Sequence, residues 1–367
     1  MDIDSLLKLM LDKGASDLHL KVPSPPVLRV DGELVRQENE PPVTPQGVRE
    51  VFEQITNQQQ RDTFLADCEL DFAYSIPGVA RFRVSVMQQR GTMSLAFRMV
   101  PFEVPSIDGL GLPPVCKELV LKPRGLVLIT GATGTGKSTT LAAMISYLNE
   151  NSNRNIITIE DPIEFLFSDK KCLIRQRDLG DDTKSFPVAL KHALRHDPDV
   201  IVVGEMRDLD TIRIAITAAE TGHLVLGTLH TVDATQTVDR IIDVFPPAQQ
   251  QQIRMQLSQV IEAVLSQTLV ACIGGGRTAA LEIMIANSTI RKLILQERLL
   301  ELSGNIAVSS REGMQTLNKA LVDLVSRGII AREEAMSKTN DSADLNRLLQ
   351  SLNGVSEHQG DSGYNSV

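Results

Sequence analysis

A glycine-rich segment between an apolar run and a helical one constrains this chain more than any other feature. Residues 131–139 read GATGTGKST and match the pattern GxxxxGK[ST], after the run GLVLIT (125–130) and before LAAMISYLN (141–149). Glycines let backbone N–H groups turn inward around phosphates, and the N-terminus of the following helix adds its dipole. A chance glycine turn is the alternative, but it does not explain why strand, loop and helix follow in this order. The sequence predicts a phosphate-binding loop in an α/β fold.

Each residue type in the loop has a chemical use. A lysine at this position reaches the β- and γ-phosphates of a nucleotide, and the hydroxyl after it ligates Mg²⁺. ATP and Mg²⁺ are therefore the expected cofactors. We expect the nucleotide to be held by Gly131, Ala132, Thr133, Gly134, Thr135, Gly136, Lys137, Ser138 and Thr139, with Lys137 also catalytic and Ser138 on the metal.

Hydrophobic patterning divides the chain. The apolar runs GLVLIT, NIITIE, VIVVG, LVLGT and AALEIMI alternate with amphipathic stretches, which is typical of a parallel sheet covered on both faces. Before them lie short helices, a hairpin with Asp31 and Gly32 at its tip, and three longer strands in meander order. The predicted parts are an α+β domain with an antiparallel sheet (1–100), a Pro- and Gly-rich linker (101–122), a nucleotide-binding core (123–286), a helical region (287–345) and a disordered tail (346–367).

Carboxylates follow two of the apolar runs. In IVVGEMRD, Glu205 stands at the C-terminal edge of a buried strand, where α/β sheets bind ligands, and we expect it to hold Mg²⁺ through water. An ordinary surface glutamate is the alternative. In ITIEDPIE, the candidates to orient or deprotonate an attacking water are Glu160, Asp161 and Glu164. An acidic loop is the alternative there, and the residues alone do not rank Glu160 against Glu164.

Two histidines flank another apolar run, HLVLGTLH. His230 ends this run near the same edge of the sheet and could sense a γ-phosphate, whereas His223 stands at the opposite end. Opposite ends of one strand cannot share a metal ion, so the spacing does not predict a metal site. A structural histidine is the alternative at both positions.

Arginines gather on the last strands of the N-terminal domain, at Arg81, Arg83, Arg90 and Arg98. Arg81 and Arg83 occupy alternate positions, so their side chains point to the same face. In an oligomeric ATPase, arginines from a neighbouring subunit can stabilise charge on the transferring phosphoryl group. A solvated cationic face is the alternative. Further candidates within or next to the core motifs are Arg195, Arg207 and Arg240.

Composition counts against several classes of function. A net charge of −9 and a pI near 5.3 disfavour free nucleic acid as a partner, and the chain has no Trp and only three Tyr for base stacking. Its four cysteines form no CxxC pair, which argues against a zinc clip. No apolar run is long enough to predict a membrane span. We therefore expect a cytoplasmic protein.

Four segments together resemble the Walker A, Asp-box, Walker B and His-box motifs of the secretion and pilus ATPases: GATGTGKSTT, ITIEDPIE, IVVGEMRD and TGHLVLGTLHT. Similarity to the PilT-type retraction branch is carried by GASDLHL, PPVLRVDGEL, ARFRVSVMQQRG, VDRIIDVFPPAQQ and GMQTLNKALVDLV, over residues 1–340. The resemblance implies a PAS-like N-terminal domain on a RecA-like core with a parallel-rich sheet and C-terminal helices, assembled as a homohexameric ring.

The resemblance also assigns roles and partners. It implies ATP hydrolysis that drives type IV pilus retraction, hence twitching motility, at the inner membrane. The expected partners are an inner-membrane platform protein and other pilus ATPases, and the association with the membrane is peripheral. The catalytic set that it implies, besides Lys137, is Glu164 (the catalytic glutamate), Glu205 (the Walker B glutamate), His230 (the His box) and the N-domain arginines Arg81, Arg83 and Arg98.

Several rival functions stay open. The segment TIRKLILQ (289–296) departs from the AIRNLIRE that retraction motors typically carry, so the chain could be a principal motor or an accessory paralogue. Assembly and type II secretion ATPases usually have a tetracysteine motif and longer N-terminal regions, and neither is found here. A DNA-translocating motor is disfavoured by the net charge. A regulator that binds ATP without hydrolysing it is disfavoured because the residues for hydrolysis are intact.

Overall fold

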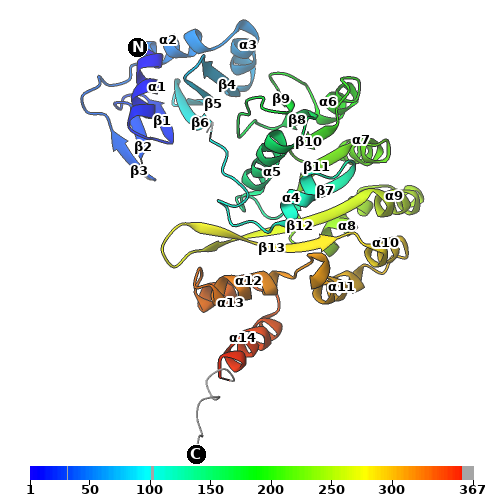
Figure 1. The fold of residues 1–367 in the computed structure, drawn as a ribbon. Coiled ribbons are helices and arrows are strands. Elements are labelled where there is room, and N and C mark those ends of the chain that lie inside the picture. The colour runs from blue at the N-terminus through cyan, green and yellow to red at the C-terminus, as the bar shows by residue number, and fades with distance from the viewer. Residues whose placement is uncertain (31, 101–102, 358–367) are drawn as a thin grey trace, which may run out of the picture. The chain divides into compact units, whose positions relative to one another are not determined.

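The computed structural model describes residues 1–30, 32–100 and 103–357 and divides into two compact units (Figure 1). The first unit holds Met1–Glu103 with two short later segments, Pro162–Leu166 and Gly180–Asp182. The second unit holds the rest of the described chain.

The first unit is an antiparallel sheet with three helices packed on one face. The strand order is β3-β2-β1-β6-β5-β4. Strand residues alternate between the two faces, so Phe82, Val84 and Val86 are buried while the residues between them face away from the core. The elements are α1 (Ile3–Asp12), β1 (Asp17–Lys21), β2 (Val27–Val30), β3 (Glu33–Arg36), α2 (Pro45–Ile55), α3 (Gln58–Asp67), β4 (Glu69–Ile76), β5 (Ala80–Gln89) and β6 (Thr92–Val100).

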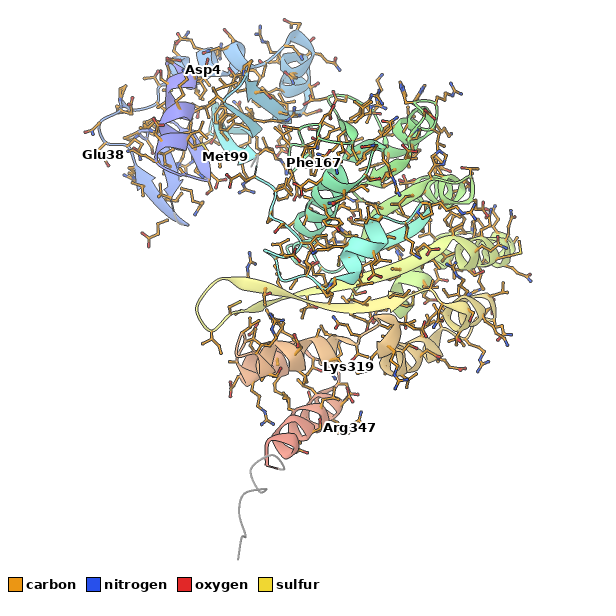
Figure 2. All side chains as sticks on the ribbon, viewed as in Figure 1. Asp4, Glu38, Met99, Phe167, Lys319 and Arg347 are labelled. Carbon is orange, nitrogen blue, oxygen red and sulfur yellow. The ribbon has the colours of Figure 1, made fainter. Side chains whose placement is uncertain are left out.

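Local sequence explains these helices. In α1 the apolar residues recur at helical spacing and are buried, and the Asp2 side chain accepts a hydrogen bond from the Asp4 backbone N–H at the helix N-terminus. Asp4, labelled in Figure 2, also accepts a hydrogen bond from the Tyr74 hydroxyl at 2.9 Å, which ties α1 to β4.

The predicted hairpin is β2–β3, with Val30 paired to Glu33; Asp31 lies outside the described residues.

The second unit contains a sheet in the order β13-β12-β7-β11-β10-β8-β9, in which all neighbours are parallel except β12 and β13. Helices α4 and α5 cover one face, and α6 to α10 cover the other. The central strands β7, β10 and β11 are entirely buried, which is why they read as continuous apolar runs. The elements are α4 (Val115–Val120), β7 (Gly125–Thr130), α5 (Lys137–Asn151), β8 (Asn155–Glu160), β9 (Leu173–Asp178), α6 (Phe186–Ala193), β10 (Val200–Val203), α7 (Leu209–Glu220), β11 (Leu224–Leu229), α8 (Ala234–Asp243), α9 (Pro247–Val260), β12 (Ile261–Ala271), β13 (Arg277–Ile285) and α10 (Ser288–Leu295).

A cluster of short helices follows α10. They are η1 (Leu299–Glu301), α11 (Leu302–Val308), η2 (Ser310–Glu312), α12 (Leu317–Ser326), α13 (Arg332–Lys338) and α14 (Ser342–Glu357). Helices α12 to α14 share a small core with Val270 of β12 and Ala280 of β13. Among the described residues, no helix combines the length and apolarity needed to cross a membrane.

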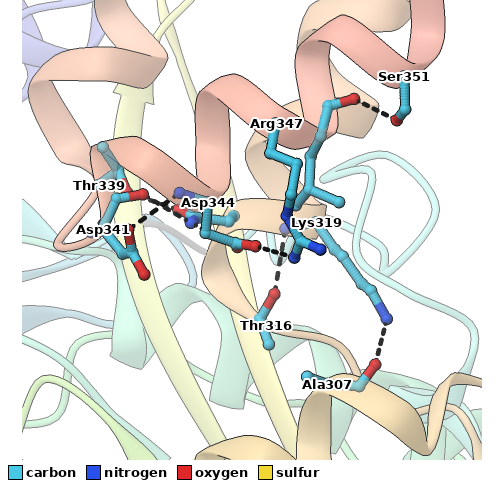
Figure 3. Close-up of polar contacts among 10 residues, drawn as sticks. Ala307, Thr316, Lys319, Thr339, Asp341, Asp344, Arg347 and Ser351 are labelled. Carbon is cyan, nitrogen blue, oxygen red and sulfur yellow. Dashed lines mark hydrogen bonds and ion pairs between the residues drawn. The ribbon is translucent and has the colours of Figure 1, made fainter.

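The expected disordered tail is wrong for residues 346–357, because α14 continues to Glu357. Two leucines one helical turn apart, Leu345 and Leu349, are buried in the core with α12. Figure 3 shows the polar contacts beside them: Asp341 accepts from the Asp344 backbone N–H at 3.0 Å, and Arg347 donates to Asp344 at 2.5 Å. The polar composition of this segment predicts disorder, but tertiary packing of its few apolar residues stabilises the helix. The rest of the expected tail, 358–367, lies outside the described residues.

Candidate active site

The phosphate-binding loop lies where β7 meets α5, as predicted. Gly131, Gly134 and Gly136 have φ angles of 143°, 80° and 86°, a region that favours glycine. Helix α5 begins at Lys137 with Gly136 as its N-cap and no side-chain cap, so its first N–H groups are not satisfied by a capping oxygen. An uncapped helix N-terminus next to a glycine turn suits a phosphate group. The loop residues Ala132 and Thr133 are exposed, and Ser138 and Thr139 are half-buried in the first turn of α5.

A glutamine from a neighbouring strand supports the loop. Gln267 of β12 donates from Nε2 to the Thr135 carbonyl at 2.7 Å and accepts at Oε1 from the Thr140 hydroxyl at 2.7 Å. It is 3% exposed. Neither this residue nor the strand that carries it is predicted from the sequence. The polar Ser-Gln pair inside an apolar run could have indicated a supporting residue. The run follows α9 directly, however, so no turn residue marks the start of the strand.

Lys137 is nearly buried, and its ammonium is held in place. Nζ donates to the carbonyls of Gly131 at 2.7 Å and Ala132 at 3.1 Å, and lies 3.4 Å from Nδ1 of His230. An ammonium can only donate, so Nδ1 of His230 must be the acceptor. The ring proton of a neutral His230 then lies on Nε2.

His230 lies between Lys137 and Glu205 and contacts both. Its Nε2 lies 2.9 Å from Oε1 of Glu205, and Nε of Arg207 lies 2.6 Å from the same oxygen. Parallel register brings these residues together, because β7, β11 and β10 end at one edge of the sheet. The structure thus links three of the predicted site residues, Lys137, His230 and Glu205, in one chain of contacts.

Electrostatics keep Glu205 ionised. Burial acts to raise the pKa of its carboxyl, but hydrogen bonds from Arg207 and His230 outweigh burial and leave the pKa below its ordinary value. The carboxylate is 17% exposed, so water still reaches it. An ionised, partly hydrated carboxylate can hold the waters of a metal ion.

The donor set fits Mg²⁺ that arrives with phosphates. Within the described residues, no group of three or more His, Cys, Asp or Glu is arranged to hold a metal ion by itself. Mg²⁺ usually keeps several waters and takes one or two protein oxygens together with the phosphates of its substrate. Ser138 and Glu205 offer one hydroxyl and one carboxylate, which matches that requirement.

The other predicted acids differ in setting. Glu160, at the end of β8, accepts hydrogen bonds from the Thr158 hydroxyl at 2.6 Å and from Gln176 at 3.2 Å, so its carboxylate is already engaged. Asp161 and Glu164 are exposed. Glu164 lies in the segment that belongs to the first unit.

The arginines of the N-terminal domain also lie in the first unit. Arg81 and Arg83 share one face of β5, as predicted, and Arg98 stands directly opposite Arg83 on β6. Arg90 is in the turn between the two strands with a φ of 46°. The remaining candidates, Arg195 and Arg240, are exposed.

His223 has a structural explanation. Its Nδ1 lies 2.9 Å from the Ala218 carbonyl and 3.3 Å from the Thr221 hydroxyl, where it closes the turn between α7 and β11. This contact lies at the end of β11 opposite to His230. These contacts explain His223 as a structural histidine.

Comparison with known proteins identifies the family of this chain. Residues 2–275 match the family model described as Type II/IV secretion system protein, a span that includes the loop, Glu205 and His230. The chain belongs to the Type II/IV secretion system protein family. Among relatives in this family, it is 50% identical to the type IV pilus retraction ATPase PilT of Pseudomonas aeruginosa, over 92% of this chain and 98% of that protein. It is 42% identical to the type IV pilus ATPase PilU of the same organism, over 97% of this chain and 93% of PilU.

A solved structure of this secretion-system family shares the fold. The crystal structure of the pilus retraction motor PilT with bound ADP matches with a TM-score of 0.88 and 44% identity, covering 95% of this chain and 99% of that one. The predicted fold class is confirmed: a core with a parallel-rich sheet, a smaller α+β N-terminal domain and C-terminal helices. The resemblance to the secretion and pilus ATPases that the motifs indicated is confirmed as well.

Proposed function

We propose that this chain is an ATPase motor that hydrolyses ATP to ADP and phosphate and drives type IV pilus retraction. The observation that carries the proposal is 50% identity to a pilus retraction ATPase along 98% of that protein. The contacts among Lys137, His230 and Glu205 at the phosphate loop support the hydrolytic part. The ADP in the related PilT structure supports nucleotide binding.

In the proposed mechanism, Lys137 exchanges its carbonyl partners for β- and γ-phosphate oxygens. The remaining loop residues, 131–136 with Ser138 and Thr139, surround the phosphates with backbone N–H groups and hydroxyls. Mg²⁺, held by Ser138 and, through water, by Glu205, would neutralise charge on the β- and γ-phosphates. His230 contacts both Lys137 and Glu205, and through them it would sense the γ-phosphate.

The chemical step requires a base and further positive charge. We assign Glu164 as the group that orients and deprotonates the attacking water. We assign Arg81, Arg83 and Arg98 to stabilise the negative charge that develops on the transferring phosphoryl group.

The motor is proposed to work as a homohexameric ring in the cytoplasm, bound peripherally to the inner membrane. Its partners would be an inner-membrane platform protein, which receives the motion, and other pilus ATPases. Nucleic acid is not an expected partner, because the net charge of −9 opposes binding to a phosphate backbone. The domain division predicted from the sequence stays part of this proposal, except for residues 346–357, which are helical.

A steady-state assay of the purified chain tests the hydrolytic assignments. We expect Mg²⁺-dependent phosphate release that Lys137→Ala lowers by about 100-fold or more in kcat/KM. Glu164→Gln should lower kcat by a similar factor with ATP binding retained. Glu160→Gln is the matched control, because that carboxylate is engaged by Thr158 and Gln176. Loss of turnover in Glu160→Gln but not in Glu164→Gln would reverse the assignment.

An accessory retraction motor is the second candidate. The segment TIRKLILQ at 289–296 departs from the typical retraction sequence, and the chain aligns with PilU over 97% of its length. A deletion strain distinguishes the two roles: a principal motor is required for every retraction event, whereas loss of an accessory motor leaves some retraction in place.

A further inference from the structure

The open face of the N-terminal sheet carries a row of charged residues that spans most of the sheet. Cross-strand pairing joins Arg83 to Arg98, Arg98 to Asp17, and Asp17 to Arg29. Residues directly opposite each other on antiparallel strands share a face. The neighbouring residues Leu18, Leu28 and Phe97 point to the opposite face and are buried in the core.

Asp17 differs from the other members of this row because it is 5% exposed although it lies on the open face. Its two oxygens are divided between partners. Oδ1 accepts from Nε of Arg98 at 2.8 Å, while Oδ2 accepts from the Ser16 hydroxyl at 2.7 Å and lies 3.8 Å from Nε of Arg29. Burial acts to raise the pKa of Asp17, but the bonds from Ser16 and Arg98 leave that pKa below its ordinary value. The carboxylate is thus ionised at neutral pH.

The Arg98 guanidinium is hydrogen-bonded through Nε, whereas its terminal nitrogens are not part of this bond. Its side chain is 70% exposed, and Nε is its only hydrogen-bonding nitrogen within the described residues. The two terminal nitrogens therefore form an unoccupied fork. A planar guanidinium fork matches the oxygens of a phosphoryl group, and a fixed fork loses less conformational freedom when it binds.

Arg83 provides a contrast on the same face. Its Nη2 lies 3.7 Å from Oδ2 of Asp71, and both side chains are about half exposed, Arg83 at 46% and Asp71 at 59%. A pair of this kind is screened by solvent and holds neither side chain firmly.

We infer that Asp17 is a positioning residue for ATP hydrolysis: it holds Arg98 with its terminal fork free to receive phosphoryl oxygens. This inference rests on the proposed function, in which Arg98 stabilises the transferring phosphoryl group. Asp17 does not itself touch the nucleotide. Its carboxylate sets the orientation of the guanidinium and reduces the number of rotamers that Arg98 can adopt.

Binding of a phosphoryl-transfer mimic tests the inference without turnover. The full chain is titrated with fluorescent ADP alone, and with the same ADP plus aluminium fluoride and Mg²⁺. We expect Asp17→Asn to weaken binding of the aluminium fluoride complex about threefold to tenfold, the effect of freeing one rotamer-rich side chain, and to leave binding of ADP alone unchanged. A general loss of structure would weaken both. Asp17→Glu should restore part of the difference.

A double-mutant cycle connects Asp17 to Arg98. In an Arg98→Ala background, Asp17→Asn should change binding of the complex less than twofold, because the residue through which it acts is gone. An equal loss in both backgrounds would show that Asp17 acts by another route and would overturn the inference. Asp71→Asn is the matched control on the same face, and a loss as large as that of Asp17→Asn would show that only the charge of the face matters.

A second variant keeps the test valid if Asp17→Asn does not fold. Arg98 is exposed, so Arg98→Lys should fold normally, yet a lysine cannot pair with Asp17 and also present a fork. We expect Arg98→Lys to lose as much binding of the complex as Arg98→Ala, and full binding by Arg98→Lys would contradict the inference. Failure of the proposed function is seen separately, as a wild-type chain that releases no phosphate from ATP.

Discussion

Gly131 opens the phosphate loop at a place where a side chain does not fit. A Cβ atom there would lie 2.4 Å from the Gln267 carbonyl oxygen and 2.7 Å from the Thr135 hydroxyl, and the φ angle is 143°. The first obstacle is the main chain of β12, which is paired with β7 and cannot rotate away. Gly131→Ala should therefore deform the loop and the adjacent strand together.

Gly134 is the matched control, because it has a φ of 80° but nothing within 4 Å of its Cβ position. Placing alanine at a left-handed backbone position costs about 1–2 kcal/mol, and both variants carry this cost. Overpacking adds about 1–3 kcal/mol to Gly131→Ala alone. We expect the free energy of unfolding to fall by about 2–5 kcal/mol for Gly131→Ala and by about 1–2 kcal/mol for Gly134→Ala, the sums of these costs.

Urea denaturation followed by circular dichroism measures this difference, and phosphate release measures its consequence. A misplaced loop costs about 100-fold in rate, so Gly131→Ala should lose at least that factor in kcat/KM. If the denaturation midpoint of Gly131→Ala shifted no further than that of Gly134→Ala, the close approach of β12 to the loop would not be the constraint described here.

Three other predictions concern separate parts of the chain. The pKa of Glu205 is lower in the folded state than its ordinary value, so the ionised carboxylate stabilises the fold fully above the ordinary pKa, and this stabilisation is lost as the pH falls through the folded-state pKa. The thermal midpoint of the wild type should therefore drop more between pH 7 and acid conditions than that of Glu205→Gln, by a modest amount because water reaches the carboxylate. Equal drops in the two proteins would contradict this prediction. Leu345→Ala should destabilise α14 by about 2–5 kcal/mol, seen as faster proteolysis after α13 with ATPase activity retained; unchanged proteolysis would show that this contact does not hold α14 in place. Burial raises the pKa of the Cys116 thiol to about 12, so iodoacetamide at pH 8 should modify the exposed Cys68 and reach Cys116 only after unfolding, and rapid labelling of both in the native chain would refute it.

The parts of the fold that follow local rules could be predicted. The central strands β7, β10 and β11 are buried on both faces, so their sequences contain only apolar or small residues along most of their length. The phosphate loop could be predicted because its glycines, lysine and helix lie within one short segment. The placement of Glu205 and His230 near the loop followed from the rule that parallel strands end at one edge.

Two strands of the core sheet were not predicted, for different reasons. β9 reads LIRQRD and lies at the edge of the sheet, where charged residues are tolerated. β12 follows α9 directly, with Val260 ending the helix and Ile261 beginning the strand, so no Gly or Pro marks the change. Both assignments depend on which strands lie alongside, and local sequence does not contain that information.

The supporting contacts of the site could not be predicted either. Gln267 and Thr140 are 127 residues apart in the chain, yet their side chains share a hydrogen bond. Asp17 and Arg98 are separated by 81 residues and meet only because β1 pairs with β6. Patterns along the chain therefore identify the residues with chemical roles, while the residues that orient them depend on strand order and register.

Deletion of the gene in its host, with counts of surface pili and tracking of twitching, tests the central claim most directly. We predict abundant pili that do not retract, with movement restored by the wild-type gene and not by Lys137→Ala. Absence of pili would instead make the chain an assembly motor. Normal pili with normal movement would contradict a role in retraction.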